Sequence, residues 1–372
     1  MSDSEESDQE IWIPFNERKE WDDVAPIYIV DGPDSICPIA YTVEFKETMA
    51  YLRAIMQAGE VSERAFELVG EAIKLNPANY TAWLYRIKIF QDLDLDVKKE
   101  LAWISMIAND NPKNYQVWHQ RQKIVDSLVK SNKIKEFDIE LDKTTKDNLS
   151  MVSNSDTVSI DESLVLLTKN LGNEIAKNEI EFINSQISSD SKNFHAWSYR
   201  QYIIKTFELW DYEKVYLESK INQDIRNNSA WNQRYFVLLK GKMDFKITDT
   251  EVLEKEIRYT TEKIVLAPNN ESSWVYIQGL LRVHSEELLY SMFYKTIHDF
   301  MENEDNKNRM ESSRFYWSFM FKYYRYKASH INNASKSEQS MWTEKAQQVC
   351  TYLAESLDPI RKNYWVYMST KC

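Results

Sequence analysis

Glycine and proline are scarce in this sequence. Its 372 residues contain 6 Gly and 8 Pro, whereas average usage predicts roughly 26 and 19. β-Sandwiches and nucleotide-binding α/β folds need glycines in their turns and phosphate loops, so this composition excludes both classes. Charged residues make up 28% and hydrophobic residues 43%, which is typical of a globular chain and not of a disordered one. Long stretches of packed helix are therefore predicted.

Other absences narrow the function. The three cysteines (Cys37, Cys350 and Cys372) are far apart and odd in number, which favours a reducing compartment without a disulfide framework. The acidic first ten residues do not resemble a signal peptide, and no apolar run approaches the ~20 residues of a membrane span. The net charge of −12 argues against a general nucleic-acid binder. We expect a cytoplasmic protein with no nucleic acid and no membrane span.

Tryptophan, in contrast, is abundant and recurs in one setting. Trp83 and Trp118 are 35 residues apart, and Trp197 and Trp231 are 34 apart. The longer interval between Trp118 and Trp197 equals one period plus about 45 residues. Weaker copies surround Trp274 and Trp365, and the gap between these two predicts a degenerate copy near Trp317 or Tyr323. A period of 34 indicates a helix–turn–helix unit that stacks on its neighbours.

The residues around the repeat tryptophans indicate where the helices begin and end. An Asn four residues before the Trp is a good N-cap, and a Pro near it stops the preceding helix. An Arg follows three residues after the Trp in four copies, at positions 86, 121, 200 and 234. We expect these Arg residues to bind groups of the neighbouring hairpin and the recurring Trp and Tyr to form the core between repeats. The Trp-x2-Leu-Gly-x2-Tyr pattern of tetratricopeptide repeats is absent.

The repeat predicts an all-α fold, a right-handed α-α superhelix of helical hairpins with a crescent shape. Residues 1–43 are interpreted as an acidic tail followed by an extended arm that lies against some other surface and is not a free linker. Residues 44–372 are interpreted as one helical-hairpin repeat domain. Within it, residues from about 130 to 170 are rich in Lys, Asp, Ser, Asn and Thr, which predicts a polar, largely disordered insertion.

The residues alone reveal little catalytic chemistry. The five histidines show no metal-ligand spacing with one another or with cysteine, so no metal site is predicted. Lys113 and Lys192 each lie five residues before a repeat Trp, beside a predicted cap at a helix N-terminus, where anions are favoured. They are either two lysines that converge on a dianion such as a diphosphate or two solvated loop residues. Gln116 and His195 either face the same concave surface or pack at a helix start.

A resemblance to a known family favours the ligand-binding interpretation of these residues. The runs Pro112–Arg121 and Arg226–Val237 resemble the repeat of protein prenyltransferase α-subunits. Glu20–Pro26, Asp31–Pro33 and Ser62–Phe66 resemble the subunit that protein farnesyltransferase shares with type I geranylgeranyltransferase. The likeness covers nearly the whole chain except the tail and the insertion. A Rab-type geranylgeranyltransferase α-subunit and a non-catalytic helical-repeat scaffold are the alternatives.

The resemblance implies the α-subunit of a heterodimeric enzyme. Such an enzyme transfers a prenyl group from prenyl diphosphate to the Cys of a C-terminal Cys-a-a-X protein, for example a small GTPase. The partner β-subunit would carry Zn²⁺, and Mg²⁺ would assist the farnesyl reaction. The choice between farnesyl and geranylgeranyl would belong to the β-subunit.

The same resemblance assigns individual residues. Lys113 would contact the diphosphate, Tyr115 would lie beside it, and Gln116 would bind the carboxylate of the acceptor peptide. The remaining residues expected to bind substrate are Asn114, Lys192, Asn193 and His195. The sequence departs from the family at Phe194, where Tyr is usual.

Overall fold

The computed structural model describes residues 12–29, 32, 36–139, 171–241, 250–283, 286–330 and 336–372. Within these residues the fold is all-α, as predicted, apart from one isolated antiparallel bridge between Asp138 and Asn173. The chain divides into two compact units, residues 1–140 with 172–200 and residues 141–171 with 201–372. The boundary falls inside one helix, Phe194–Thr206.

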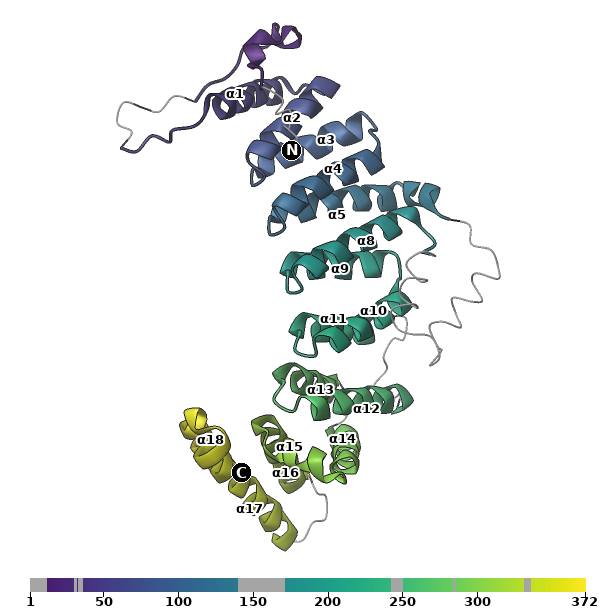
Figure 1. Cartoon of the computed structure of the whole chain (residues 1–372), viewed down its shortest axis with the longest axis vertical. Coiled ribbons are helices and arrows are strands. Elements are labelled where there is room, and N and C mark those ends of the chain that lie inside the picture. The colour runs from purple at the N-terminus through teal and green to yellow at the C-terminus, as the bar shows by residue number, and fades with distance from the viewer. Residues whose placement is uncertain are drawn as a thin grey trace, which may run out of the picture. The chain divides into compact units, whose positions relative to one another are not determined.

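Unit 1 consists of an N-terminal arm and a stack of helical hairpins (Figure 1). The arm contains two short 3-10 helices, η1 (Phe15–Glu17) and η2 (Lys19–Trp21). The α-helices that follow are α1 (Val43–Ala58), α2 (Glu63–Leu75), α3 (Tyr80–Asp92), α4 (Val97–Asp110), α5 (Tyr115–Lys130), α8 (Glu174–Ser189) and α9 (Phe194–Thr206). Helix α2 packs on α1 and α3, and α5 packs on α3 and α4, so each hairpin buries its apolar side against the next.

Unit 2 continues the same architecture from the end of α9. Its helices are α10 (Trp210–Gln223), α11 (Asn228–Lys240), α12 (Thr250–Leu266), α13 (Glu271–Val283), α14 (Glu286–Met301), α15 (Glu304–Glu311), α16 (Arg314–His330), α17 (Lys336–Tyr352) and α18 (Lys362–Ser369). A π-helical turn, η4 (Leu353–Leu357), and a 3-10 turn, η5 (Pro359–Arg361), join α17 to α18. Helices α16 and α17 pack against each other as a long hairpin (Figure 1).

The predicted helix starts are confirmed. Asn79, Asn114 and Asn227 lie just before α3, α5 and α11, and each side chain accepts a hydrogen bond from an amide of the first turn. Asn193 and Asn270 accept equivalent bonds at the starts of α9 and α13. An N-cap of this kind stabilises a helix by about 1 kcal/mol.

Each repeat tryptophan is fixed by a hydrogen bond that the sequence did not reveal. The indole Nε1 of Trp83 donates to the carbonyl of Pro77, six residues earlier, at 2.8 Å. Trp118, Trp197, Trp231 and Trp274 repeat this bond at 2.8–2.9 Å. Trp317 donates to the carbonyl of Glu311 in the same register, which confirms a degenerate copy at this position. At the last copy, Trp365 donates to the side chain of Asp358.

Three of these carbonyls accept a second hydrogen bond, from the cap residue of the following repeat. The carbonyl of Pro112 accepts from Trp118 Nε1 and from Asn193 Nδ2, each at 2.9 Å. The carbonyl of Ile225 accepts from Trp231 and Asn270, and that of Pro268 from Trp274 and Ser313. A carbonyl oxygen has two lone pairs, so this arrangement satisfies it fully and joins consecutive repeats. We call it the shared-carbonyl staple.

The repeat arginines have the structural role that was predicted, since Arg86 and Arg121 donate to the main-chain carbonyls of Phe66 and Leu101. Their carboxylate partners were not predicted. Arg121 is buried on α5 and forms a paired hydrogen bond with Glu179 of α8, whose Oε2 lies 2.9 Å from Nε. The Arg86–Glu100 and Arg234–Glu256 pairs have the same geometry. Each guanidinium also lies 3.7–3.8 Å from the centroid of an aromatic ring, so its charge is both paired and stacked.

The start of the predicted insertion is folded, which corrects the expectation of disorder from about residue 130. After α5 ends at Lys130, residues Lys133–Phe137 form the 3-10 helix η3. The side-chain amide of Asn173 donates to the carbonyl of Ile134 at 3.0 Å and to Asp138 at 2.7 Å. Because Asn173 also caps α8, it ties this segment to a helix end. Residues 140–170 lie outside the described residues.

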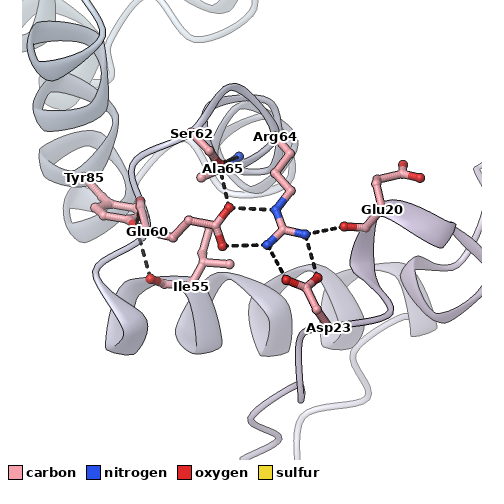
Figure 2. Close-up of polar contacts among 8 residues, drawn as sticks. All are labelled: Glu20, Asp23, Ile55, Glu60, Ser62, Arg64, Ala65 and Tyr85. Carbon is pink, nitrogen blue, oxygen red and sulfur yellow. Dashed lines mark hydrogen bonds and ion pairs between the residues drawn. The ribbon is translucent and has the colours of Figure 1, made fainter.

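The N-terminal arm packs on α1 and α2 through its aromatic residues and through Arg64 of α2, whose polar contacts are drawn in Figure 2. Phe15 and Trp21 are buried and contact the ring of Tyr51 on α1. Arg64 of α2 donates to both carboxylate oxygens of Asp23, at 2.7 and 2.9 Å, and to the main-chain carbonyl of Glu20. The two motifs that resemble the shared prenyltransferase subunit, at residues 20–26 and 62–66, therefore contact each other.

The buried Arg121–Glu179 pair gives a stability prediction. Replacing Glu179→Ala leaves a buried guanidinium without its counter-charge, which costs about 3–5 kcal/mol in the free energy of unfolding. Glu174→Ala, on the same helix, removes an exposed pair with Lys98 and should cost less than about 1 kcal/mol. Denaturant unfolding measures both values. Equal effects of the two variants would contradict a structural role for the buried pair.

The Asp23–Arg64 contact predicts how firmly the arm is held. Hydrogen bonds from Arg64 lower the pKa of Asp23 below its ordinary value, so the contact persists at neutral pH and is lost as pH falls through the folded-state pKa. At neutral pH, Asp23→Asn should speed amide hydrogen exchange in residues 17–24 several-fold. Asp22→Asn is the matched control, since this exposed neighbour does not bind Arg64. Unchanged exchange in Asp23→Asn would show that the aromatic contacts alone hold the arm.

Candidate functional site

The seven residues predicted to act on substrate lie at the N-termini of α5 and α9, both in unit 1. Asn114 accepts a hydrogen bond from the amide of Gln116 at 2.8 Å, and Asn193 accepts one from the amide of His195 at 3.0 Å. Uncapped amides of a first helical turn carry partial positive charge and favour anions. Two such helix ends lie next to each other here.

Direct contact between the two helix ends is made by Tyr115 and His195. Their ring centroids are 4.7 Å apart with an interplanar angle of 79°, an edge-on packing. Tyr115 is 67% exposed, so its phenol remains accessible beside the imidazole. Burial lowers the pKa of His195 below its ordinary value, which favours the neutral imidazole. The structure thus brings these two predicted site residues into contact, while their role toward a substrate stays a prediction.

The two lysines are linked by a residue that sequence reasoning missed. Lys113 Nζ lies 3.3 Å from Oδ2 of Asp190, and Oδ1 of the same carboxylate accepts the main-chain amide of Lys192 at 3.1 Å. The amide of Lys192 and the ammonium of Lys113 lower the pKa of Asp190. Asp190 thus balances the charge of Lys113. The sequence contains a pattern that could have pointed to Asp190. Asn or Asp recurs seven residues before the repeat Trp, at positions 76, 111, 190 and 224.

Asn193 has a more structural position than predicted. Its side chain is buried, its oxygen caps α9, and its nitrogen donates to the carbonyl of Pro112 in the shared-carbonyl staple. Gln116 is half-buried, and its side-chain amide makes no hydrogen bond to another described residue. Lys192 is exposed. Lys113, Lys192 and Gln116 therefore offer polar groups to a ligand, while Asn114 and Asn193 hold the helix ends in place.

One sequence prediction about this surface is wrong. The tyrosine three residues before the repeat Trp was expected in the core, but Tyr80 is 64% exposed, and the equivalent Phe194 is 68% exposed. Positions three before and one after the Trp are four residues apart and share a helix face. Leu84 and His119 occupy the second of these positions and are also exposed. We call the exposed row on α3, α5 and α9, which consists of Tyr80, Leu84, Tyr115, His119 and Phe194, the aromatic stripe.

Two searches of the described part of the chain bear on cofactors and membranes. No three His, Cys, Asp or Glu side chains there are grouped so that they could hold a metal ion. None of its helices combines the length and apolarity that crossing a bilayer requires.

Comparison with known proteins identifies the family. A family model for the protein prenyltransferase alpha subunit repeat matches residues 62–93, 97–128, 176–207, 210–241 and 253–283. The protein farnesyltransferase/geranylgeranyltransferase type-1 subunit alpha of Dictyostelium discoideum is 30% identical over 377 residues, covering 98% of this chain and 95% of that relative. This chain belongs to the farnesyltransferase/geranylgeranyltransferase type-1 α-subunit family.

A solved structure supports the same assignment for the fold. Candida albicans protein geranylgeranyltransferase-I complexed with GGPP contains a chain that matches with a TM-score of 0.69 and 27% identity, covering 95% of this chain and 99% of that one. The likeness to the Rab-type alternative is more limited. Geranylgeranyl transferase type-2 subunit alpha of Rattus norvegicus is 24% identical over 245 residues, or 60% of this chain and 35% of that relative.

As an α-subunit of this family, the chain is part of a protein prenyltransferase enzyme. The family assignment also explains the position of the repeats. The five matched segments each contain a helix pair, with the repeat Trp on the second helix. The degenerate copy at Trp317 and the final copy at Trp365 follow the last matched segment.

Proposed function

We propose that this α-subunit pairs with a prenyltransferase β-subunit and helps it transfer a prenyl group to the Cys of a Cys-a-a-X protein. The observation that carries the proposal is the pair of adjoining helix N-termini, α5 and α9, with Lys113, Tyr115 and His195 accessible at their junction. A diphosphate is a compact polyanion, and helix N-termini with nearby lysines are suited to bind it.

The reaction joins the sulfur of the acceptor Cys to the first carbon of the prenyl diphosphate. The carbon–oxygen bond breaks, and the diphosphate leaves with the electron pair. Charge therefore accumulates on the leaving diphosphate. Lys113 would exchange its exposed partner Asp190 for this group and stabilise the developing charge. Tyr115 lies two residues after Lys113 and contacts His195, so its phenol would border the same anion.

The remaining residues would orient the two substrates. Gln116 would donate from its unengaged amide to the C-terminal carboxylate of the acceptor peptide. Lys192 and His195 would line the diphosphate end of the site, with His195 gaining a proton as the anion arrives. Asn114 and Asn193 would act through their caps, which keep both helix ends in position.

The partner subunit would supply the metal. Zn²⁺ there would lower the pKa of the acceptor thiol and present it as a thiolate, and Mg²⁺ would assist the farnesyl reaction by neutralising diphosphate charge. The aromatic stripe is the face we assign to the β-subunit, because exposed aromatic and aliphatic side chains in a continuous row are typical of interface cores. A cytoplasmic location remains a prediction from the sequence.

The role of Lys113 can be tested by substitution. In the purified heterodimer, Lys113→Ala should lower the single-turnover rate of prenyl transfer by about 10²-fold, because one charge-stabilising donor is lost. Assembly with the β-subunit should not change, since the Lys113 side chain is 75% exposed and its ion pair with Asp190 is exposed too. Lys123→Ala, an exposed lysine on the same helix, is the matched control. An unchanged single-turnover rate in Lys113→Ala would refute the assigned role.

The function as a whole can be tested by co-expression. The chain and a prenyltransferase β-subunit should elute together as a 1:1 complex and transfer a labelled prenyl group to a Cys-a-a-X peptide. A peptide with Ser in place of the acceptor Cys is the control. Failure to bind any such β-subunit would favour a non-catalytic helical scaffold. Complex formation without transfer would contradict the catalytic proposal alone.

A further inference from the structure

A cavity of about 750 Å³ lies between α16 and α17 in unit 2. The two helices pack along their length as a hairpin (Figure 1). Small side chains, Ala328 on α16 and Ala346 on α17, leave room between the helices, and Tyr290 of α14 closes one side. The volume is in the range of small-molecule sites. The cavity shares no residue with the candidate site in unit 1.

The cavity is lined by positive charge. Lys322 and Arg325 project from α16, Lys336 from α17, and Lys371 from the C-terminal end, whereas no Asp or Glu occurs among the described lining residues. Four formal positive charges therefore surround one space in a chain of net charge −12. A cleft lined by charge of one sign focuses the electrostatic potential and concentrates counter-ions of the opposite sign.

These cations differ from others in the same unit. Arg234, Lys255 and Arg361 each form an ion pair with a carboxylate. Within the described residues, Arg325, Lys336 and Lys371 form none, and Lys322 donates to the neutral amide of Gln278 at 2.5 Å. Like charges that face one space repel one another. An anion in the cavity would relieve that repulsion, because no Asp or Glu side chain is among the described lining residues.

The uncharged lining has the hydrogen-bonding chemistry that phosphates use. The hydroxyl groups of Ser340 and Thr343 on α17 line the cavity with Tyr326 of α16. Tyr326 is held by ring contacts with Tyr290 and His330, with centroids 4.9 and 4.6 Å apart. Hydroxyl donors between lysine and arginine side chains are typical partners of phosphate oxygens. The aromatic contacts fix one wall of the cavity.

We propose that the α16–α17 cavity binds a small molecule that carries two or more phosphate groups. The ligand is either a free polyphosphorylated compound or the phosphorylated headgroup of a lipid, which have the same recognition chemistry. Its phosphates bind Arg325 and Lys336 from the facing helices, with Lys322 and Lys371 at the sides. The site is separate from prenyl-diphosphate binding and does not depend on it.

The test uses the full-length chain, purified with its β-subunit if it requires one. Inositol hexakisphosphate is titrated by calorimetry, and vesicles of phosphatidylcholine with 5% phosphatidylinositol 4,5-bisphosphate are tested by co-sedimentation. Saturable binding of either probe that falls at least tenfold in Arg325→Glu/Lys336→Glu would support the site. Binding of the soluble probe or of the vesicles alone would identify the source of the phosphates. Affinity should also fall with added salt.

Matched variants separate this site from general charge effects. Lys327→Glu/Lys345→Glu makes the same charge change on the same two helices outside the lining and should bind normally. Circular dichroism confirms that each variant is folded. The proposal is overturned if neither probe binds saturably up to about 1 mM, a Kd that corresponds to only about −4 kcal/mol, or if both double variants lose binding equally.

Discussion

The structure depends on main-chain carbonyls between repeats that accept two hydrogen bonds each, seen at Pro112, Ile225 and Pro268. In the best example, the carbonyl of Pro112 joins Trp118 of its own repeat to Asn193 of the next. Removing either donor would take away one of the two hydrogen bonds to a part-buried carbonyl, which costs about 0.5–1.5 kcal/mol. The staple therefore sets the distance and the register between hairpins. The same geometry at Ile225 and Pro268 shows that it is a property of the repeat.

The candidate site inherits its geometry from this staple. Lys113 directly follows Pro112, whose carbonyl is the acceptor, and Lys192 directly precedes Asn193, which is the donor. The bond that joins the two repeats therefore also fixes the spacing of the two lysines. Substrate chemistry can be placed at such a junction without altering the core. Among the described repeats, a lysine lies directly before the cap residue of α5 and of α9. A site can thus be added to a common fold through a few residues at particular positions.

Features set by short spacings along the chain could be predicted from the sequence. Contacts between residues far apart in the sequence could not. Cap residues, helix ends, the repeat tryptophans and the hidden copy at Trp317 all follow from fixed spacing along the chain. The carboxylate partners of the arginines do not, because Arg86 and Glu100 are 14 residues apart, Arg121 and Glu179 are 58 apart, and Arg234 and Glu256 are 22 apart. Variable loops and the insertion change that spacing while the spatial contact is kept.

The same distinction explains the exposed aromatic residues and Asp190. Tyr80 and Phe194 are aromatic at a helical period, which usually indicates a core, but their exposure depends on which helix faces are left uncovered. Asp190 pairs with Lys113 across 77 residues. This exposed ion pair contributes at most about 1 kcal/mol, much less than the buried Arg121–Glu179 pair. It can therefore hold Lys113 in place in the isolated chain and still yield to the proposed diphosphate, whose charge is greater and whose oxygens would also meet two helix N-termini.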